Sequence, residues 1–155
     1  FPEYAFTPEL LTDALRTASL PGRLVVALAI VVSAPLLEEL IFRGYVWRVL
    51  EASLGPLAAL IGSTLLFATF HLDPVQSLAL LPTALFLGWL RSVSGSLVPS
   101  MVTHLMNNGL GVALAVASAE EGEIGLGVAL GGFVATIGIG AFGVWLTRRG
   151  GSAVP

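Results

Sequence analysis

The sequence lacks cysteine and lysine and contains few charged residues of any kind. With no cysteine among 155 residues, disulfides, thiolate metal ligands and a cysteine nucleophile are excluded. All seven basic residues are arginines, they form no cluster, and the net charge is −3, so no nucleic-acid partner is expected. Charged residues make up 11% of the chain, whereas soluble domains carry about 25%. These deficits are typical of a membrane protein.

Hydrophobic residues take the place of the missing charges. They make up 55% of the chain, and the mean hydropathy is +0.91. A membrane-spanning helix needs roughly 20 predominantly apolar residues. The turn signals that separate the apolar runs predict five spans, at residues 24–48, 57–71, 75–93, 97–118 and 124–146. We therefore expect an all-α, polytopic transmembrane helical bundle in the cell membrane.

The flanking segments are more polar than this core. Residues 1–23 have an amphipathic pattern that predicts an N-terminal interfacial helix ending near Pro21-Gly22. Residues 24–147 then form the transmembrane core, and residues 148–155 form a C-terminal tail. We expect a kink at Pro82, an acidic loop at residues 120–123 and, from the arginine distribution, a cytoplasmic C-terminus. Because the sequence begins with Phe1 and not Met, we expect further sequence and further spans upstream.

Three charged residues interrupt the first apolar run. Glu38, Glu39 and Arg43 lie there among aliphatic residues, and charges at membrane depth mark a functional site or a paired structural charge. Glu39 precedes Arg43 by four residues, the better orientation for an ion pair on a helix. Glu38 lies about 100° further round an α-helix, which leaves it free to act as a general base. The structural alternative is that both carboxylates hold neighbouring helices together.

The only two histidines also lie in or next to apolar helices, at His71 and His104. A single membrane histidine is as often a hydrogen-bonding group between helices as a catalyst. His104 and Asn108 are one turn apart, however, so both could donate to one point and form an oxyanion hole. Together with Glu38 they predict a hydrolytic site, in which Glu38 accepts a proton from water and His71 orients or shares that proton.

The polar residues fall into three ordered motifs, Glu38-Glu39-x-x-x-Arg43, Phe67-x-x-x-His71 and His104-x-x-x-Asn108. This set resembles the CAAX prenyl endopeptidase and bacteriocin-processing (CPBP, or Abi) family of intramembrane proteases, over about residues 25–115. The run Gly88-Trp89-Leu90-Arg91 fits the same family. The resemblance implies an all-helical endopeptidase that hydrolyses a peptide or protein substrate, including substrates with a lipidated C-terminus.

The resemblance also implies a role for each motif residue. Glu38 matches the water-activating glutamate and His71 its partner. His104 and Asn108 match the pair that stabilises the transition state. Glu39 and Arg43 match the supporting residues of the first motif.

Two alternatives remain open from the sequence. Glu38, His71 and His104 could supply three ligands for a catalytic zinc, but the His-Glu-x-x-His signature is absent, so we favour a route without a metal or other cofactor. The chain could also be a non-proteolytic membrane protein, such as a proton-coupled carrier or an immunity or scaffold protein. Its buried Glu, His and Arg would then form a relay or a packing network. Convergence of the side chains on one place favours the enzyme, and dispersal along a path favours transport.

Overall fold

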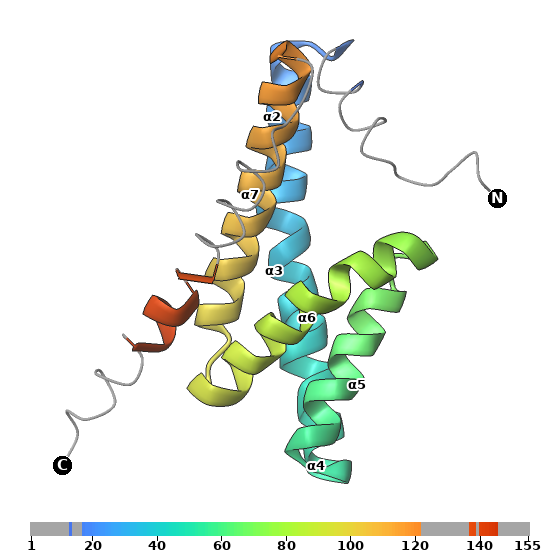
Figure 1. The fold of residues 1–155 in the computed structure, drawn as a ribbon, viewed down its shortest axis with the longest axis vertical. Coiled ribbons are helices and arrows are strands. Elements are labelled where there is room, and N and C mark those ends of the chain that lie inside the picture. The colour runs from blue at the N-terminus through green and yellow to red at the C-terminus, as the bar shows by residue number, and fades with distance from the viewer. Residues whose placement is uncertain (1–12, 14–16, 122–136, 139, 146–155) are drawn as a thin grey trace.

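The computed structural model describes residues 13, 17–121, 137–138 and 140–145, and within them every regular element is helical. This agrees with the all-α prediction. One continuous helical run covers Leu20–Leu54, built from α2 (Leu20–Leu28), η2 (Ala29–Ser33), α3 (Ala34–Glu38), η3 (Glu39–Val46) and α4 (Trp47–Leu54). It is followed by α5 (Pro56–Thr69), α6 (Pro74–Ser94) and α7 (Val98–Glu121) (Figure 1).

The first helical run is wound unevenly. Its segments η2 and η3 are π-helical, so that the Trp47 N–H, for example, bonds to the Phe42 carbonyl five residues earlier. Pro35 follows η2 closely and is buried, and a proline inside a helix removes one backbone donor and distorts the preceding turn. π-Helical turns within α-helices occur frequently at functional sites. Here η3 carries both Glu39 and Arg43.

Helix α7 runs antiparallel to the first helical run, as Figure 1 shows. His104 bonds to Glu39 and Asn108 to Ile30, so residue numbers rise along one helix as they fall along the other. Helix α5 packs against both α4 and α6, and α6 packs against α7. Gly55 and Gly95 end α4 and α6 with φ angles of 87° and 67°, which glycine adopts without steric cost.

Two details differ from the sequence predictions. Helix α2 begins at Leu20 with Pro21 in its first turn, so Pro21 starts a helix and does not end one, because proline is compatible with the first helical positions. Helix α7 extends to Glu121, so the first two residues of the expected acidic loop are helical. Pro82 lies inside α6, and the kink expected there stays a prediction.

The prediction of five membrane spans is not confirmed. Two helical runs are long and apolar enough to cross a membrane, Leu20–Leu54 and Pro74–Ser94, and the apolar helix Pro56–Thr69 is shorter. Most of the expected fifth span at 124–146, and most of the expected interfacial segment at 1–23, lie outside the described residues.

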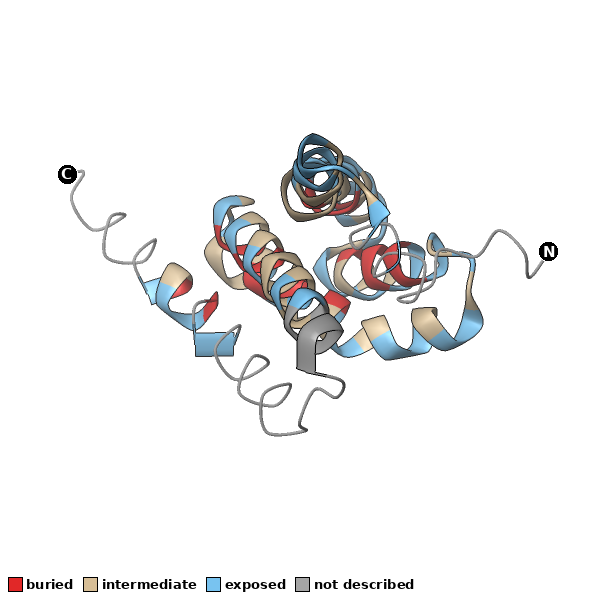
Figure 2. Ribbon diagram, turned by 90° about the horizontal axis from the view of Figure 1, so that it is seen from above, coloured by how far each residue is buried: buried red, intermediate tan, exposed pale blue. Residues whose placement is uncertain are grey.

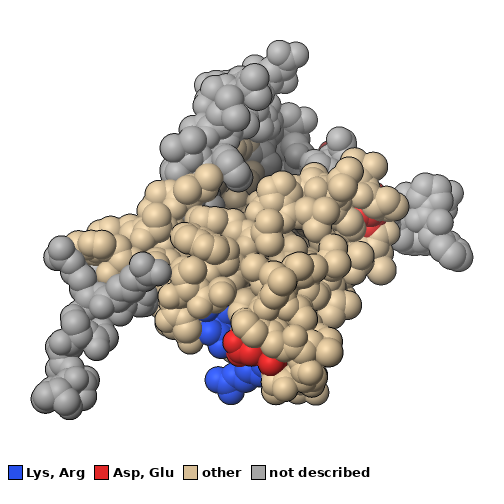
Figure 3. Space-filling model, turned by 60° about the horizontal axis from the view of Figure 1, so that its bottom comes forward, with Lys and Arg blue, Asp and Glu red and all other residues tan. Residues whose placement is uncertain are grey.

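Burial follows the pattern of a bundle that faces lipid. Large apolar side chains such as Tyr45, Leu57 and Val75 are exposed, while Glu39, Arg43 and His104 are buried. Figure 2 shows the buried residues in short stretches of the helices, and α2 and η2 have none. Most of the described surface in Figure 3 carries no charge, and Arg and Glu side chains gather in one small area. The polar groups of the interior therefore depend on one another for partners.

The contact between α5 and α6 gives a test of the packing. A Cβ at Gly88 would lie 2.8 Å from Leu60 Cδ1 and 3.4 Å from Thr64 Oγ1. We expect Gly88→Leu to lower the free energy of unfolding in detergent by about 1–3 kcal/mol, because overpacking separates the helices. At Gly111 nothing lies within 4 Å of such a Cβ, so Gly111→Leu is the matched control. Equal stability of the two variants would contradict this packing.

Candidate active site

The expected ion pair between Glu39 and Arg43 is present and fully buried. Arg43 Nη1 lies 3.0 Å from Glu39 Oε1, and both side chains are 0% exposed. Arg43 Nη2 donates a second hydrogen bond, of 2.9 Å, to the Ala84 carbonyl on α6. One guanidinium thus neutralises a carboxylate of its own helix and binds a carbonyl of the neighbouring helix. Lysine could not reproduce both contacts, because its ammonium lacks the planar set of N–H donors.

His104 lies between the two glutamates. Its Nδ1 is 3.0 Å from Glu39 Oε1, and its Nε2 is 3.5 Å from Glu38 Oε2. Because Oε1 of Glu39 already accepts a bond from Arg43, we assign Nδ1 of His104 as the donor. A carboxylate on Nδ1 sets the tautomer of an imidazole and the direction of its Nε2, so Glu39 directs Nε2 of His104 toward Glu38. The Glu38 side chain is 20% exposed and His104 5%, which makes Glu38 the more open group.

His71 lies in the turn that joins α5 to α6. Its Nδ1 is 3.2 Å from the Phe67 carbonyl; since a carbonyl only accepts, Nδ1 is the donor and Nε2 of the neutral ring is the acceptor. His71 is near enough to Glu38 to interact with it electrostatically. The two histidines that lie near Glu38 therefore come from different elements.

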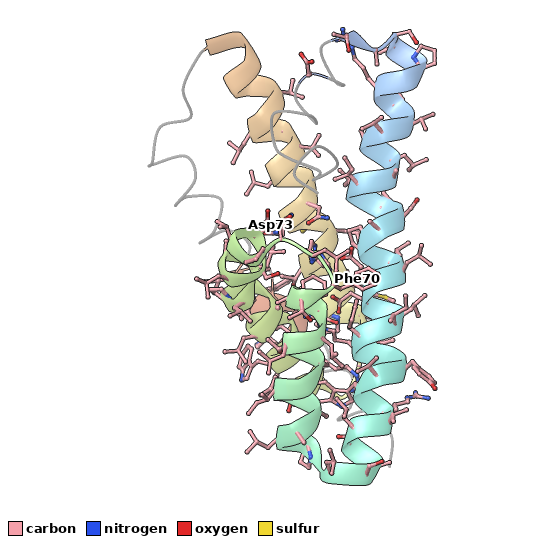
Figure 4. All side chains as sticks on the ribbon, turned by 90° about the vertical axis from the view of Figure 1, so that its right-hand side faces the viewer. Phe70 and Asp73 are labelled. Atoms are coloured by element: carbon pink, nitrogen blue, oxygen red, sulfur yellow. The ribbon has the colours of Figure 1, made fainter. Side chains whose placement is uncertain are left out.

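Two contacts hold this turn, which Figure 4 shows between α5 and α6. The Phe70 ring packs against Phe42 at 5.6 Å between centroids. Asp73 caps α6 by accepting a 2.8 Å bond from the Gln76 N–H. Leu72, between them, has a φ of 57°, an uncommon and strained conformation for a bulky residue. Such outliers cluster at functional sites, in keeping with the position of His71.

Asn108 does not converge with His104 on one point in this structure. Its Nδ2 donates a 3.0 Å bond to the Ile30 carbonyl in η2. A side-chain amide has two N–H donors, so one of them is used here to join α7 to the first helical run. The pairing of His104 with the glutamates, and of Asn108 with a backbone carbonyl, was not anticipated from the sequence.

Phe67 is a further residue of the site, although the motif that contains it predicts no role for it. Its ring centroid lies 4.4 Å from the Arg43 guanidinium carbon, 5.3 Å from the His71 ring and 5.6 Å from the His104 ring. The negative face of an aromatic ring stabilises a nearby cation. Phe67 precedes His71 by one helical turn, a spacing that could have suggested a shared face.

The sequence left open a metal site formed by Glu38, His71 and His104. Among the described residues, no three His, Cys, Asp or Glu side chains are grouped so that they could hold a metal ion. The choice between a metal-dependent and a metal-free route stays a prediction.

The comparisons with known proteins give one match. The model of a family described as "Type II CAAX prenyl endopeptidase Rce1-like" matches residues 20–110, which is more than half of the chain and includes all three motifs. No curated protein and no solved structure matches.

The buried pair predicts a large stability effect. Glu39→Gln leaves the Arg43 charge buried and unneutralised, so we expect the free energy of unfolding in detergent to fall by about 3–5 kcal/mol. Glu51 is exposed on α4, and Glu51→Gln, the matched control, should cost less than about 0.5 kcal/mol. The double variant Glu39→Gln/Arg43→Met should recover part of the loss. A Glu39→Gln protein as stable as the control would show that the pair is not needed.

Proposed function

The chain belongs to the Rce1-like family of type II CAAX prenyl endopeptidases, and from that premise we propose that it is an intramembrane endopeptidase of the glutamate type. The observation that carries the proposal is the His104 ring between Glu38 and Glu39, at 3.5 and 3.0 Å. Three charged groups of the first helical run, Glu38, Glu39 and Arg43, gather with a histidine from α7 at one level of the bundle. A carrier would need titratable groups spread along a path, so the convergence favours hydrolysis.

In the proposed reaction Glu38 is the general base. It takes a proton from a water molecule as the water oxygen attacks the scissile carbonyl carbon. The same proton then passes to the nitrogen of the leaving amine as the tetrahedral intermediate collapses, so Glu38 ends ionised. General bases of this kind contribute about 10²–10⁴-fold to rate. Partial exposure of Glu38 suits this role because both water and substrate must reach it.

The remaining motif residues are proposed to position the reacting groups and to stabilise the oxyanion. Glu39, neutralised by Arg43, holds Nδ1 of His104 and so directs Nε2 toward the reacting atoms. His71, in the turn that joins α5 to α6, interacts electrostatically with Glu38 and helps to orient the attacking water. His104 and Asn108 do not converge in the structure itself, and we propose that bound substrate brings its developing oxyanion within reach of the second N–H of Asn108 and of Nε2 of His104. Donation from Nε2 requires a proton on both ring nitrogens, because Nδ1 already donates to Glu39. Fixed donors are most effective in a water-poor site.

We propose that this reaction uses no metal or other cofactor. The support is that, among the described residues, no three His, Cys, Asp or Glu side chains are grouped as metal ligands. We also propose a multi-pass protein of the cell membrane that acts on a peptide or protein substrate, including one with a lipidated C-terminus, as the family description indicates.

The role of Glu38 is tested by substitution. We expect Glu38→Gln to lower kcat for peptide cleavage by about 10²–10⁴-fold, because the amide cannot accept the proton. The melting temperature should stay near that of the parent protein, since the substitution is isosteric. Glu51→Gln should keep full activity. Full activity of the Glu38→Gln protein on a true substrate would overturn the proposal.

Metal dependence is tested by chelation. Purified protein incubated with a strong zinc chelator and then freed of it should cleave its substrate at an unchanged rate. A loss of activity that added zinc restores would favour the metalloprotease route. Substrates for both assays can be sought by comparing the proteomes of cells that carry the parent protein or the Glu38→Gln variant, with prenylated and unprenylated peptides as follow-up probes.

A further inference from the structure

The first helical run contains a carbonyl group that Pro35 leaves without a backbone donor. In η2 the Ala34 N–H bonds to the Ala29 carbonyl, five residues earlier. The same pattern would pair the Ile30 carbonyl with the nitrogen of residue 35, and proline has no N–H. An unpaired carbonyl among apolar helices is costly. The side chain that meets it is Asn108, whose Nδ2 donates at 3.0 Å.

We propose that Pro35 is a positioning residue for Asn108. By withholding its N–H, Pro35 keeps the Ile30 carbonyl available as an anchor for one hydrogen of the Asn108 amide. Because an amide group is planar, anchoring one N–H fixes the direction of the other. This inference rests on the proposed function in one respect only, namely that the second N–H of Asn108 serves the reaction.

The inference explains why a proline is buried in the middle of this helix. Proline is about 3 kcal/mol less favourable than alanine inside an α-helix, so the position is poor for stability alone. If alanine stood at position 35 and the π-helical pattern were kept, its N–H would bond to the Ile30 carbonyl. If the segment became a regular α-helix, the Ala34 N–H would bond to that carbonyl instead. In either case the carbonyl gains a backbone donor and the amide of Asn108 loses its exclusive anchor.

A double-mutant cycle tests the geometry without an activity assay. In the parent protein Asn108→Ala leaves the Ile30 carbonyl unpaired, so we expect the melting temperature in detergent to fall by about 2–6 °C. In the Pro35→Ala background the same substitution should have little effect. An equal fall in both backgrounds would overturn the proposal, since it would show that Asn108 and Pro35 act independently.

Kinetics give the second readout. We expect Pro35→Ala to match or exceed the parent protein in melting temperature and yet to lower kcat at least about tenfold, with KM little changed, because a misdirected group costs rate and not affinity. Pro82→Ala is the matched control, because Pro82 also lies inside a helix; it should leave kcat unchanged. A Pro35→Ala protein with full kcat would refute the positioning role. The proposed function fails separately. If Glu38→Gln kept full kcat while Asn108→Ala still lowered the melting temperature only when Pro35 is present, only the proposed function would be refuted.

Discussion

A charge buried among apolar helices has no water to solvate it, and this constraint shapes the centre of the molecule. Arg43 and Glu39 neutralise each other's charge, but each also needs hydrogen-bond or ring partners from other helices. Arg43 also binds the Ala84 carbonyl and lies over the Phe67 ring, and Glu39 also accepts from His104. The demand for partners thus draws α5, α6 and α7 to the same level of the first helical run. The same contacts that hold the helices together set the direction of the groups proposed to react.

Backbone groups obey the same rule as side chains. The proline in the first helical run leaves a carbonyl that only another helix can satisfy, and the strained turn after α5 is held by a capping carboxylate and an aromatic contact. Irregular backbone in this protein therefore coincides with contacts between elements. The interior of a regular α-helix has no free N–H and can offer its neighbours only the second lone pair of a carbonyl, as Ala84 does to Arg43.

Much of the helical layout could be predicted from the sequence because it depends on local signals. Gly55-Pro56, Asp73-Pro74 and Gly95 mark helix boundaries within a residue or two of those observed, and the ion pair of Glu39 with Arg43 follows from spacing on one helix. The partners of His104 and Asn108 could not be predicted in the same way. They depend on the register between α7 and the first helical run, and on a π-helical winding that shifts each side chain from its expected angle. The number of spans is not confirmed, because two of the described helical runs are long and apolar enough to cross a membrane and most of the expected fifth span lies outside the described residues.

The length of α5 has a consequence for where the chemistry would take place. A helix of 14 residues rises about 21 Å, whereas the hydrocarbon layer of a bilayer is about 30 Å thick. If the α4–α5 corner lies at one membrane surface, the turn that carries His71 ends short of the other surface. The cleavage proposed at Glu38 would then take place below the lipid headgroups, and its substrate would be a chain segment that can leave the aqueous phase.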